Sequence, residues 1–218
     1  MDIVRLYHRI GEHFRKRRMA KFSKLFKITS ETPILDVGGT PFNWKFIEYS
    51  PKIDLLNLNP SHVRAHDLSQ NMSFIWGDGL DLKFPDDYYD IAFSNSTIEH
   101  VGTYENQKIF ASEIKRVGKG FFLQTPAREF FVEPHYLTLF IHWLPISIQR
   151  RLLRNFSIWG ILARPDDQLI QKNLSEIRLL NKREFCELFH DCNIVREKFL
   201  FFTKSYIAYR QPAKKLVH

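Results

Sequence analysis

Residues Thr32-Pro-Ile-Leu-Asp-Val-Gly-Gly-Thr-Pro-Phe42 form a short apolar run that ends in an acid and two glycines. Such a run, closed by turn residues, predicts a buried β-strand that enters a tight loop. Glycine lets the backbone turn sharply and approach a ligand closely. Asp36, expected at the end of the strand, can accept hydrogen bonds from the amines and hydroxyls of a ligand. Gly-Gly also follows strands for packing alone, so the function of this loop depends on the segments downstream.

Four more strands are predicted after this loop. Each is a short apolar run closed by turn residues, at 53–60, 72–76, 89–95 and 118–124. Before the last of them, Thr103 and Glu105 open a predicted helix with an apolar face. Strands that alternate with helices along the chain indicate a parallel sheet covered on both faces. We therefore expect a doubly wound α/β fold.

The last part of the chain predicts a helix followed by two strands. Asn181 and Glu184 have the spacing of a capping box, and β-rich runs follow at 194–202 and 205–210. A tight connection at Thr203-Lys204 would pair these two runs antiparallel. We expect a Rossmann-like sheet of seven strands, mostly parallel, with an antiparallel last strand.

Residues 126–180 interrupt this alternation. The segment has no strand period and is rich in large aromatic residues and proline: Phe130, Phe131, Pro134, Tyr136, Phe140, Trp143, Pro145, Phe156, Trp159 and Pro165. We interpret it as a partly helical, aromatic insertion after the fifth strand that forms a substrate lid; the alternative is a hydrophobic cover for the sheet. No internal repeat or low-complexity linker is visible, so residues 1–218 are expected to form a single domain.

The positive charge of the chain is concentrated at its amino terminus. The formal net charge is +8, and residues 1–27 carry nine basic residues against two acidic ones, a difference of +7. Apolar residues recur at helical steps in the same segment, at Ile3, Tyr7, Ile10, Phe14, Phe22 and Phe26. We expect a basic amphipathic helix over residues 1–28, interrupted near Gly11. Its apolar stripe packs on the domain, or the helix, through residues 1–27, contacts an anionic membrane or an acidic substrate.

The composition indicates a compact globular protein. Apolar residues make up 44% of the chain, which argues against disorder, and the amino terminus is too charged for a signal peptide. We expect a cytoplasmic location, with peripheral attachment at the inner membrane face as the alternative. Cys186 and Cys192 have the spacing of neither a metal or redox pair nor a disulfide framework, and no metal site is predicted.

Taken together, four segments resemble the motifs of class I S-adenosylmethionine-dependent methyltransferases of the small-molecule type. Ile34–Gly39 resembles the glycine-rich motif of that family, and Leu56–Pro60 resembles the end of its second strand. Gly77–Gly79 and Ser94–Val101 match the segments after the third and fourth strands. The resemblance covers most of residues 30–125 and 178–210, and the closing strand pair matches the antiparallel hairpin of this fold.

The resemblance implies that S-adenosylmethionine is the cofactor. It assigns contacts with the cofactor to Asp36, Gly38, Gly39, Asn57, Asp78, Gly79, Ser94 and Asn95. Asp36 and the loop backbone would hold the ammonium and carboxylate of the methionine end, and Asp78 would accept from the adenine amino group. Asn57 lies 57 minus 36, or 21, positions after Asp36 and takes the ribose position. Ser94 and Asn95 would line the sulfonium end.

Two features depart from the family pattern. The family usually continues Asp-x-Gly-x-Gly, whereas Thr40-Pro41-Phe42 follows the glycines here, so we expect a stiffer or more closed loop. The ribose position usually holds an acid. Asn57 can donate and accept hydrogen bonds there, but these lack the strength that a charged carboxylate would add. The alternative to an active enzyme is a non-catalytic interaction module on the same fold.

Three residues are candidates for catalysis. Methyl transfer from a sulfonium is an in-line displacement, so the protein mainly aligns the acceptor and excludes water. A hydroxyl acceptor gains from a nearby base, whereas a neutral amine can lose its proton after the attack. His100 follows the fourth predicted strand, and Glu133 and His135 lie in the insertion. Each of them can instead be a structural hydrogen-bonding residue.

The acceptor is expected to be a small molecule, a glycan or a lipid-linked glycan. The carboxyl part of the chain, residues 126–210, resembles bacterial methyltransferases associated with surface polysaccharide synthesis. The basic amino terminus favours a different interpretation, a nucleic-acid-binding or RNA-methylating protein. However, Ser94–Thr97 follows the fourth strand in place of an Asn-Pro-Pro-Tyr base pocket, so no specific nucleic acid is expected. The sequence does not define the oligomeric state.

Overall fold

The computed structural model describes residues 3–59 and 68–213. The chain divides into two compact units, the first made of residues 1–94, 113–122 and 210–218 and the second of residues 95–112 and 123–209. The single domain expected over residues 1–218 stays a prediction.

Residues 3–59 and 68–95 form four strands and two α-helices. They are α1 (Ile3–Phe26), β1 (Pro33–Val37), α2 (Pro41–Trp44), β2 (Lys52–Asn57), β3 (Met72–Trp76) and β4 (Tyr89–Asn95). β1 pairs in parallel with β2 and with β4, and β2 pairs in parallel with β3. These strands confirm the predicted ones within a few residues. Because they are parallel, their carboxyl ends meet at one edge of the sheet, where ligands bind in open α/β sheets.

The remaining elements contribute one further strand of the main sheet, the two strands of the closing hairpin, and the insertion. They are η3 (Ile98–His100), α3 (Tyr104–Val117), β5 (Gly118–Pro126), β6 (Val132–Glu133), β7 (Thr138–Leu139), η4 (Ile141–Trp143), α4 (Ile146–Phe156), α5 (Ile158–Ala163), α6 (Asp167–Glu176), α7 (Lys182–Leu188), β8 (Asn193–Phe199) and β9 (Phe202–Arg210). The main sheet has seven strands in the order β3-β2-β1-β4-β5-β9-β8, and β6 and β7 form a separate pair. This topology confirms the predicted Rossmann-like sheet.

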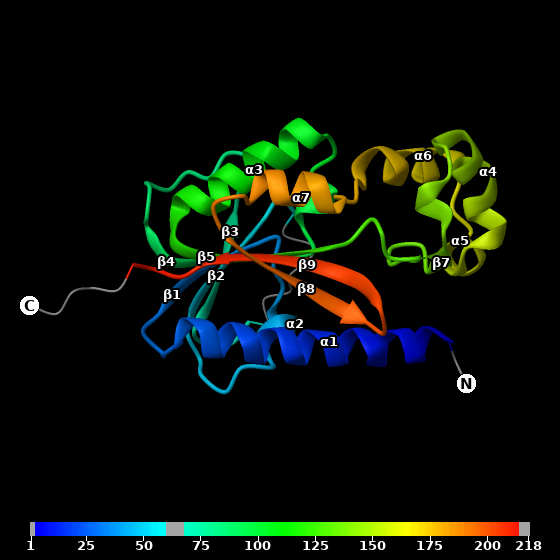
Figure 1. The fold of residues 1–218 in the computed structure, drawn as a ribbon. Coiled ribbons are helices and arrows are strands. Elements are labelled where there is room, and N and C mark those ends of the chain that lie inside the picture. The colour runs from blue at the N-terminus through cyan, green and yellow to red at the C-terminus, as the bar shows by residue number, and fades with distance from the viewer. Residues whose placement is uncertain (1–2, 60–67, 214–218) are drawn as a thin grey trace, which may run out of the picture. The chain divides into compact units, whose positions relative to one another are not determined.

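Helix α1 runs without a break from Ile3 to Phe26, so the predicted interruption near Gly11 is wrong. One glycine inside a helix costs only about 1 kcal/mol relative to alanine, which packing elsewhere in the helix offsets. Phe22 is fully buried and its ring contacts those of Trp44, Phe93 and Phe122 within the first unit. Figure 1 shows α1 in dark blue alongside the strands of that unit. The apolar stripe in the carboxyl half of α1 therefore packs on the domain.

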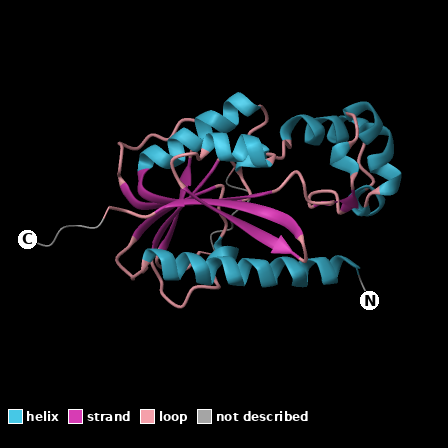
Figure 2. Cartoon of the chain, in the orientation of Figure 1, coloured by secondary structure: helices cyan, strands magenta, loops and turns pink. Residues whose placement is uncertain are grey.

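The insertion is partly helical, as predicted, with α4, α5 and α6 inside residues 126–180. Figure 2 shows its helices in cyan beside the short β6–β7 pair. The segment has a small core of its own, formed by Tyr136, Ile141, Leu153 and Ile170. These contacts explain why a stretch with no strand period still folds compactly.

The closing helix and hairpin confirm two predictions and correct a third. Asn181 and Glu184 form the predicted capping box at the start of α7. The antiparallel pair β8–β9 is also present, but it turns at Leu200 and Phe201 and not at Thr203-Lys204. Leu200 adopts a left-handed φ of 53°, so a residue without turn propensity occupies the position where the chain reverses. Thr203 and Lys204 lie inside β9, at a register shift opposite Glu197 and Lys198.

Among residues 3–59 and 68–213, no helix has both the length and the apolar character needed to cross a membrane.

Candidate functional site

The loop after β1 places a carboxylate in the interior of the first unit. Asp36, one residue before the end of β1, is fully buried. Its Oδ2 accepts a hydrogen bond of 2.8 Å from Trp44 Nε1, whereas its Oδ1 has no hydrogen-bond partner in the described part of the chain. Burial raises the pKa of Asp36 to about 7, against the opposing effect of the Trp44 hydrogen bond. A buried, half-satisfied carboxylate is costly to keep, and a ligand that donates to Oδ1 would relieve that cost.

The two glycines are required for different reasons. Gly38 has a φ of 75°, in the region that favours glycine, and its N–H donates to Leu56 O at 2.8 Å. At Gly39 a Cβ atom would lie 1.9 Å from Oδ2 of Asp36. Any side chain at position 39 would therefore collide with the Asp36 carboxylate. The predicted sharp turn is present. The absence of a side chain at Gly39 allows the Asp36 carboxylate to lie close to the backbone there.

The unusual Thr40-Pro41-Phe42 segment opens the one-turn helix α2. Thr40 is the N-cap residue and Pro41 occupies the first turn, where its missing N–H leaves no helical hydrogen bond unmade. This short helix carries Trp44 back to Asp36. The departure from the family pattern thus builds the hydrogen-bond donor that holds the carboxylate, and Trp44 is a site residue that sequence reasoning missed.

Asn57, at the end of β2, braces the same loop. Its Nδ2 donates to Gly39 O at 2.8 Å. An acid at this position would place a carboxylate oxygen against the carbonyl oxygen of Gly39, which gives a physical reason for the amide. The role of Asn57 toward a ribose stays a prediction, and its Oδ1 is the atom suited to a hydroxyl.

The other predicted cofactor residues occupy different environments. Ser94 is fully buried, and its Oγ donates to Val37 O at 3.1 Å, so it supports the end of β1. Asp78 is exposed after β3, and its Oδ1 accepts from Leu80 N at 2.9 Å, which forms a local turn. Gly79 is half-buried next to it, and half-buried Asn95 ends β4. Contacts with a cofactor at these positions stay predictions.

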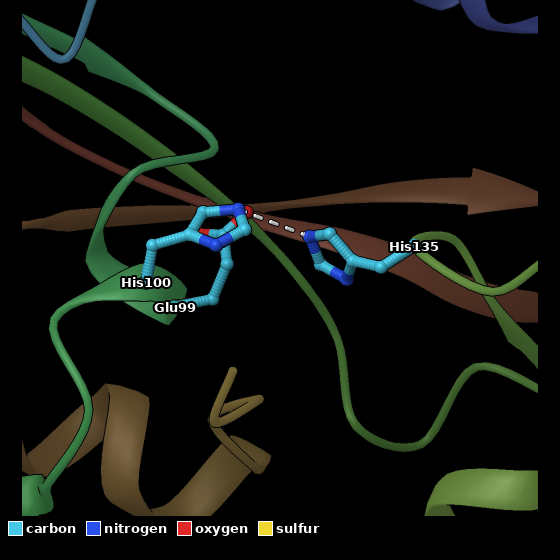
Figure 3. A group of neighbouring side chains, drawn as sticks. All are labelled: Glu99, His100 and His135. Atoms are coloured by element: carbon cyan, nitrogen blue, oxygen red, sulfur yellow. Dashed lines mark hydrogen bonds between the residues drawn. The ribbon is translucent and has the colours of Figure 1, made fainter. Parts of the chain in front are cut away.

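The second unit brings the predicted catalytic residues together. His100 ends η3, and His135 lies between β6 and β7; their Nε2 atoms are 3.2 Å apart and their rings nearly perpendicular, at 89°. The Nδ1 of His135 lies 2.7 Å from Glu133 Oε1, and the other oxygen of Glu133 accepts from Tyr136 N, also at 2.7 Å. Figure 3 shows the two imidazoles pointing toward each other from separate segments of the chain.

Glu99 joins this group, which we call the Glu/His cluster: Glu99, His100, Glu133 and His135. Glu99 is fully buried and accepts a hydrogen bond of 2.9 Å from Thr125 Oγ1 at Oε2. Its Oε1 has no hydrogen-bond partner among the residues that the structure describes. In Figure 3 the carboxylate of Glu99 lies beside the two imidazoles. Glu99 directly precedes His100 in the sequence and was not among the predicted site residues.

The pKa values of the cluster differ for physical reasons. Burial of most of its ring, together with the charge of His135, lowers the pKa of His100 to about 4, although one edge of the residue is exposed. Burial also disfavours the charged form of His135, but the hydrogen bond and charge of Glu133 and the charge of Glu99 outweigh it and raise the pKa of His135. Burial raises the pKa of Glu99 despite the opposing charge of His135. Two nitrogens and a carboxylate thus converge at a place that is buried at Glu99, half-buried at His135 and open to solvent at His100.

Part of the chain matches a family of known proteins. Residues 45–120 match a family described as "Methyltransferase domain". The tRNA (carboxymethyluridine(34)-5-O)-methyltransferase of Arabidopsis thaliana is 27% identical over 152 residues, which are 66% of this chain and 36% of that protein. The chain thus corresponds to about a third of the length of this relative.

Solved structures share the fold at low sequence identity. Magnesium protoporphyrin IX methyltransferase from Synechocystis PCC 6803, solved with bound SAH, matches with a TM-score of 0.60 and 10% identity over 96% of this chain and 87% of its own. Phosphoethanolamine N-methyltransferase 2 of Haemonchus contortus, in complex with S-adenosyl-L-methionine, matches with a TM-score of 0.54 and 11% identity over 85% of this chain and 39% of its own. These matches show the class I methyltransferase fold.

Proposed function

We propose that this chain, which carries a class I S-adenosylmethionine-dependent methyltransferase domain, transfers the methyl group of that cofactor to a hydroxyl or amine. The acceptor that we favour is a small molecule, a glycan or a lipid-linked glycan. Three features support the proposal: the loop after β1, the Glu/His cluster, and the exposed aromatic surface of the insertion.

The observation that carries the proposal is the half-satisfied carboxylate of Asp36 beside the Gly38–Gly39 turn. The residues fit S-adenosylmethionine, because Oδ1 of Asp36 can accept from an ammonium group and the side-chain-free backbone at the two glycines admits a carboxylate close to its N–H groups. Asn57 would offer Oδ1 to a hydroxyl. When bound, the cofactor supplies an electrophilic methyl group on a sulfonium. The chain itself has to bind, orient and dehydrate the reactants.

The Glu/His cluster is where the chain can handle the proton of a hydroxyl acceptor. Glu133 holds Nδ1 of His135, which fixes the ring and directs Nε2 toward His100. Such a carboxylate-oriented imidazole is a common arrangement for proton transfer. An amine acceptor can lose its proton after the transfer and does not require the imidazole of His135. If methyl transfer depends on His135, the acceptor is therefore a hydroxyl.

Exposed rings on the insertion support a glycan or lipid-linked acceptor. Phe140 and Trp143 are about half exposed and their rings contact each other, with centroids 5.0 Å apart. Phe156 and Ile146 are still more exposed. A sugar ring stacks on such aromatic faces, and exposed apolar side chains suit a lipid tail.

RNA is the second candidate acceptor, because the relative from Arabidopsis thaliana is named as a tRNA methyltransferase and the chain has a net charge of +8. Basic proteins bind nucleic acid through phosphate contacts, which weaken steeply with salt. Charge alone also suits anionic lipids, so it does not decide between the two acceptors.

One experiment separates these candidates. The purified chain is incubated with S-adenosylmethionine labelled on the methyl group and with separate glycan, lipid and RNA fractions of a cell extract. Label is expected in the glycan or lipid fraction, resistant to ribonuclease, and absent with Asp36→Ala. Asp81→Ala, which removes an exposed carboxylate paired with Lys83, serves as the control. Ribonuclease-sensitive label would transfer the proposal to RNA. No label in any fraction with a chain that binds the cofactor would favour a non-catalytic module.

A further inference from the structure

We infer that Glu99, His100 and His135 form a binding site for one divalent transition-metal ion of the zinc class. Each offers one donor atom, and these three atoms all lie within 4.8 Å of one another. Two imidazole nitrogens and a carboxylate oxygen are the donor set that zinc and its neighbours in the first transition series prefer. The sequence alone showed no metal-ligand spacing, because the three residues come from two separate segments.

The distance between the two imidazoles fits a shared ion. The Nε2 atoms of His100 and His135 are 3.2 Å apart. Zinc–nitrogen bonds of about 2.0–2.1 Å at a tetrahedral angle place two ligand nitrogens about 3.3–3.4 Å apart. The rings also approach at nearly a right angle, at 89°, so that neither covers the other's Nε2 by stacking. Figure 3 shows the two Nε2 atoms facing each other, so the side chains have to turn slightly for both lone pairs to reach one ion.

The unpaired oxygen of Glu99 is the second and independent observation. This side chain is fully buried, and Oε1 has no hydrogen-bond partner within residues 3–59 and 68–213. A buried carboxylate with an unmatched oxygen costs free energy unless a cation or a donor satisfies it. A direct hydrogen bond between the two imidazoles would explain their 3.2 Å contact but would leave Oε1 of Glu99 unmatched. A divalent ion satisfies all three groups together.

The surroundings of the three ligands have the pattern of an outer shell. Ligand histidines of metal sites usually donate their other ring N–H to a carboxylate or carbonyl, which fixes the tautomer. Glu133 is in that position, with Oε1 2.7 Å from Nδ1 of His135, and it favours the tautomer that carries its proton on Nδ1 and offers the lone pair of Nε2 to the ion. Thr125 Oγ1 donates to Oε2 of Glu99 and leaves Oε1 for the ion. Glu133 is itself held by Tyr136 N, which makes the arrangement rigid.

Three protein ligands leave a position open on a tetrahedral ion, as in catalytic rather than structural zinc sites. With the ion bound, Nε2 of His135 is a ligand and no longer a base, so a hydroxyl at the open position would lose its proton to solvent water, and it would do so more readily because the ion stabilises the resulting oxyanion. This catalytic role rests on the proposed function, and it implies that the acceptor carries a hydroxyl group. Binding of the ion itself does not depend on that function.

The test measures binding of zinc to the full chain, freed of metal by a chelator and carrying no histidine tag. Titration against a zinc indicator is expected to give one tight site per chain. Glu99→Gln and His135→Ala are each expected to weaken binding at least 100-fold, and Glu133→Gln by about 10- to 100-fold. His190→Ala is the control, because His190 is exposed and lies outside the cluster. Cobalt provides a second readout, since its visible absorption reports coordination by the same residues.

Circular dichroism and thermal unfolding show whether each variant is folded, and the comparison uses folded variants only. If Glu99→Gln unfolds, His135→Ala and cobalt absorption of the wild-type chain decide the result. Absence of stoichiometric binding, or equal affinity in the wild type, His135→Ala and His190→Ala, overturns the site. Binding of S-adenosylmethionine is measured on the same metal-free samples, so that loss of the proposed function is distinguished from loss of the metal site.

Discussion

Replacement of Asp36 by asparagine tests the electrostatics of the loop after β1. Burial raises the pKa of Asp36 from 3.8 to about 7, so the folded chain binds this proton more tightly than the unfolded chain. The protonated carboxyl of Asp36 therefore stabilises the folded chain at low pH, and this stabilisation is lost as the pH rises from about 4 to about 7. A difference of about three pH units corresponds to a cost of about 4 kcal/mol above pH 7. An asparagine side chain has nearly the same shape without the charge and avoids this cost.

The measurement is urea unfolding of the wild type and of Asp36→Asn at pH 5, 6, 7 and 8. Stability of the variant relative to the wild type is expected to increase by about 3 kcal/mol from pH 5 to pH 8. Asp90→Asn is the matched control: Asp90 is partly exposed and paired with Lys119, and such pairs contribute at most about 1 kcal/mol. A stability difference between wild type and Asp36→Asn that does not change with pH would show that burial does not shift this titration. The stabilised variant is also expected to bind S-adenosylmethionine more weakly, because a neutral amide replaces the anionic acceptor.

Three further substitutions test the packing around the site. Gly39→Ala places a Cβ 1.9 Å from the Asp36 carboxylate. It is expected to lower the free energy of unfolding by about 1–3 kcal/mol in urea and to abolish cofactor binding in calorimetry. Unchanged binding would contradict the close approach. Asn57→Asp replaces the donor to Gly39 O with an acceptor and is expected to cost about 1–3 kcal/mol at pH 7; wild-type unfolding midpoints would show that the brace is unimportant. Phe22→Ala is expected to lower the free energy of unfolding by about 3–5 kcal/mol, because Phe22 is fully buried. Phe201→Ala is the control: Phe201 is 93% exposed, and its replacement should change stability by less than about 0.5 kcal/mol. Similar losses in both variants would mean that α1 does not pack as described.

The order of strands and helices could be predicted because it depends on local patterns. Continuous apolar runs closed by turn residues marked the parallel strands, and the capping box of Asn181 and Glu184 marked the start of α7. The hairpin turn could not be placed, because Leu200 and Phe201 have no turn propensity. There the pairing of two long strands sets the conformation, and the backbone at Leu200 follows.

The candidate site was predictable in its parts and not in its contacts. The glycine turn and the acid before it were recognisable as a motif, whereas the Trp44 bond to Asp36 depends on a one-turn helix that the sequence did not suggest. His100 and His135 were both marked as candidates, but their approach across 35 positions depends on how η3 and the β6–β7 pair fold. No local pattern indicates that two such segments meet.

Calorimetric titration of S-adenosylmethionine into the purified chain asks whether the loop after β1 holds this cofactor. We expect saturable binding of one cofactor per chain, similar binding of the demethylated product, and loss of both with Asp36→Ala while Asp81→Ala binds normally. No heat and no thermal shift at millimolar cofactor would contradict cofactor binding altogether. Undiminished binding by a folded Asp36→Ala chain would contradict the site, because the carboxylate of Asp36 would then have no part in holding the ligand.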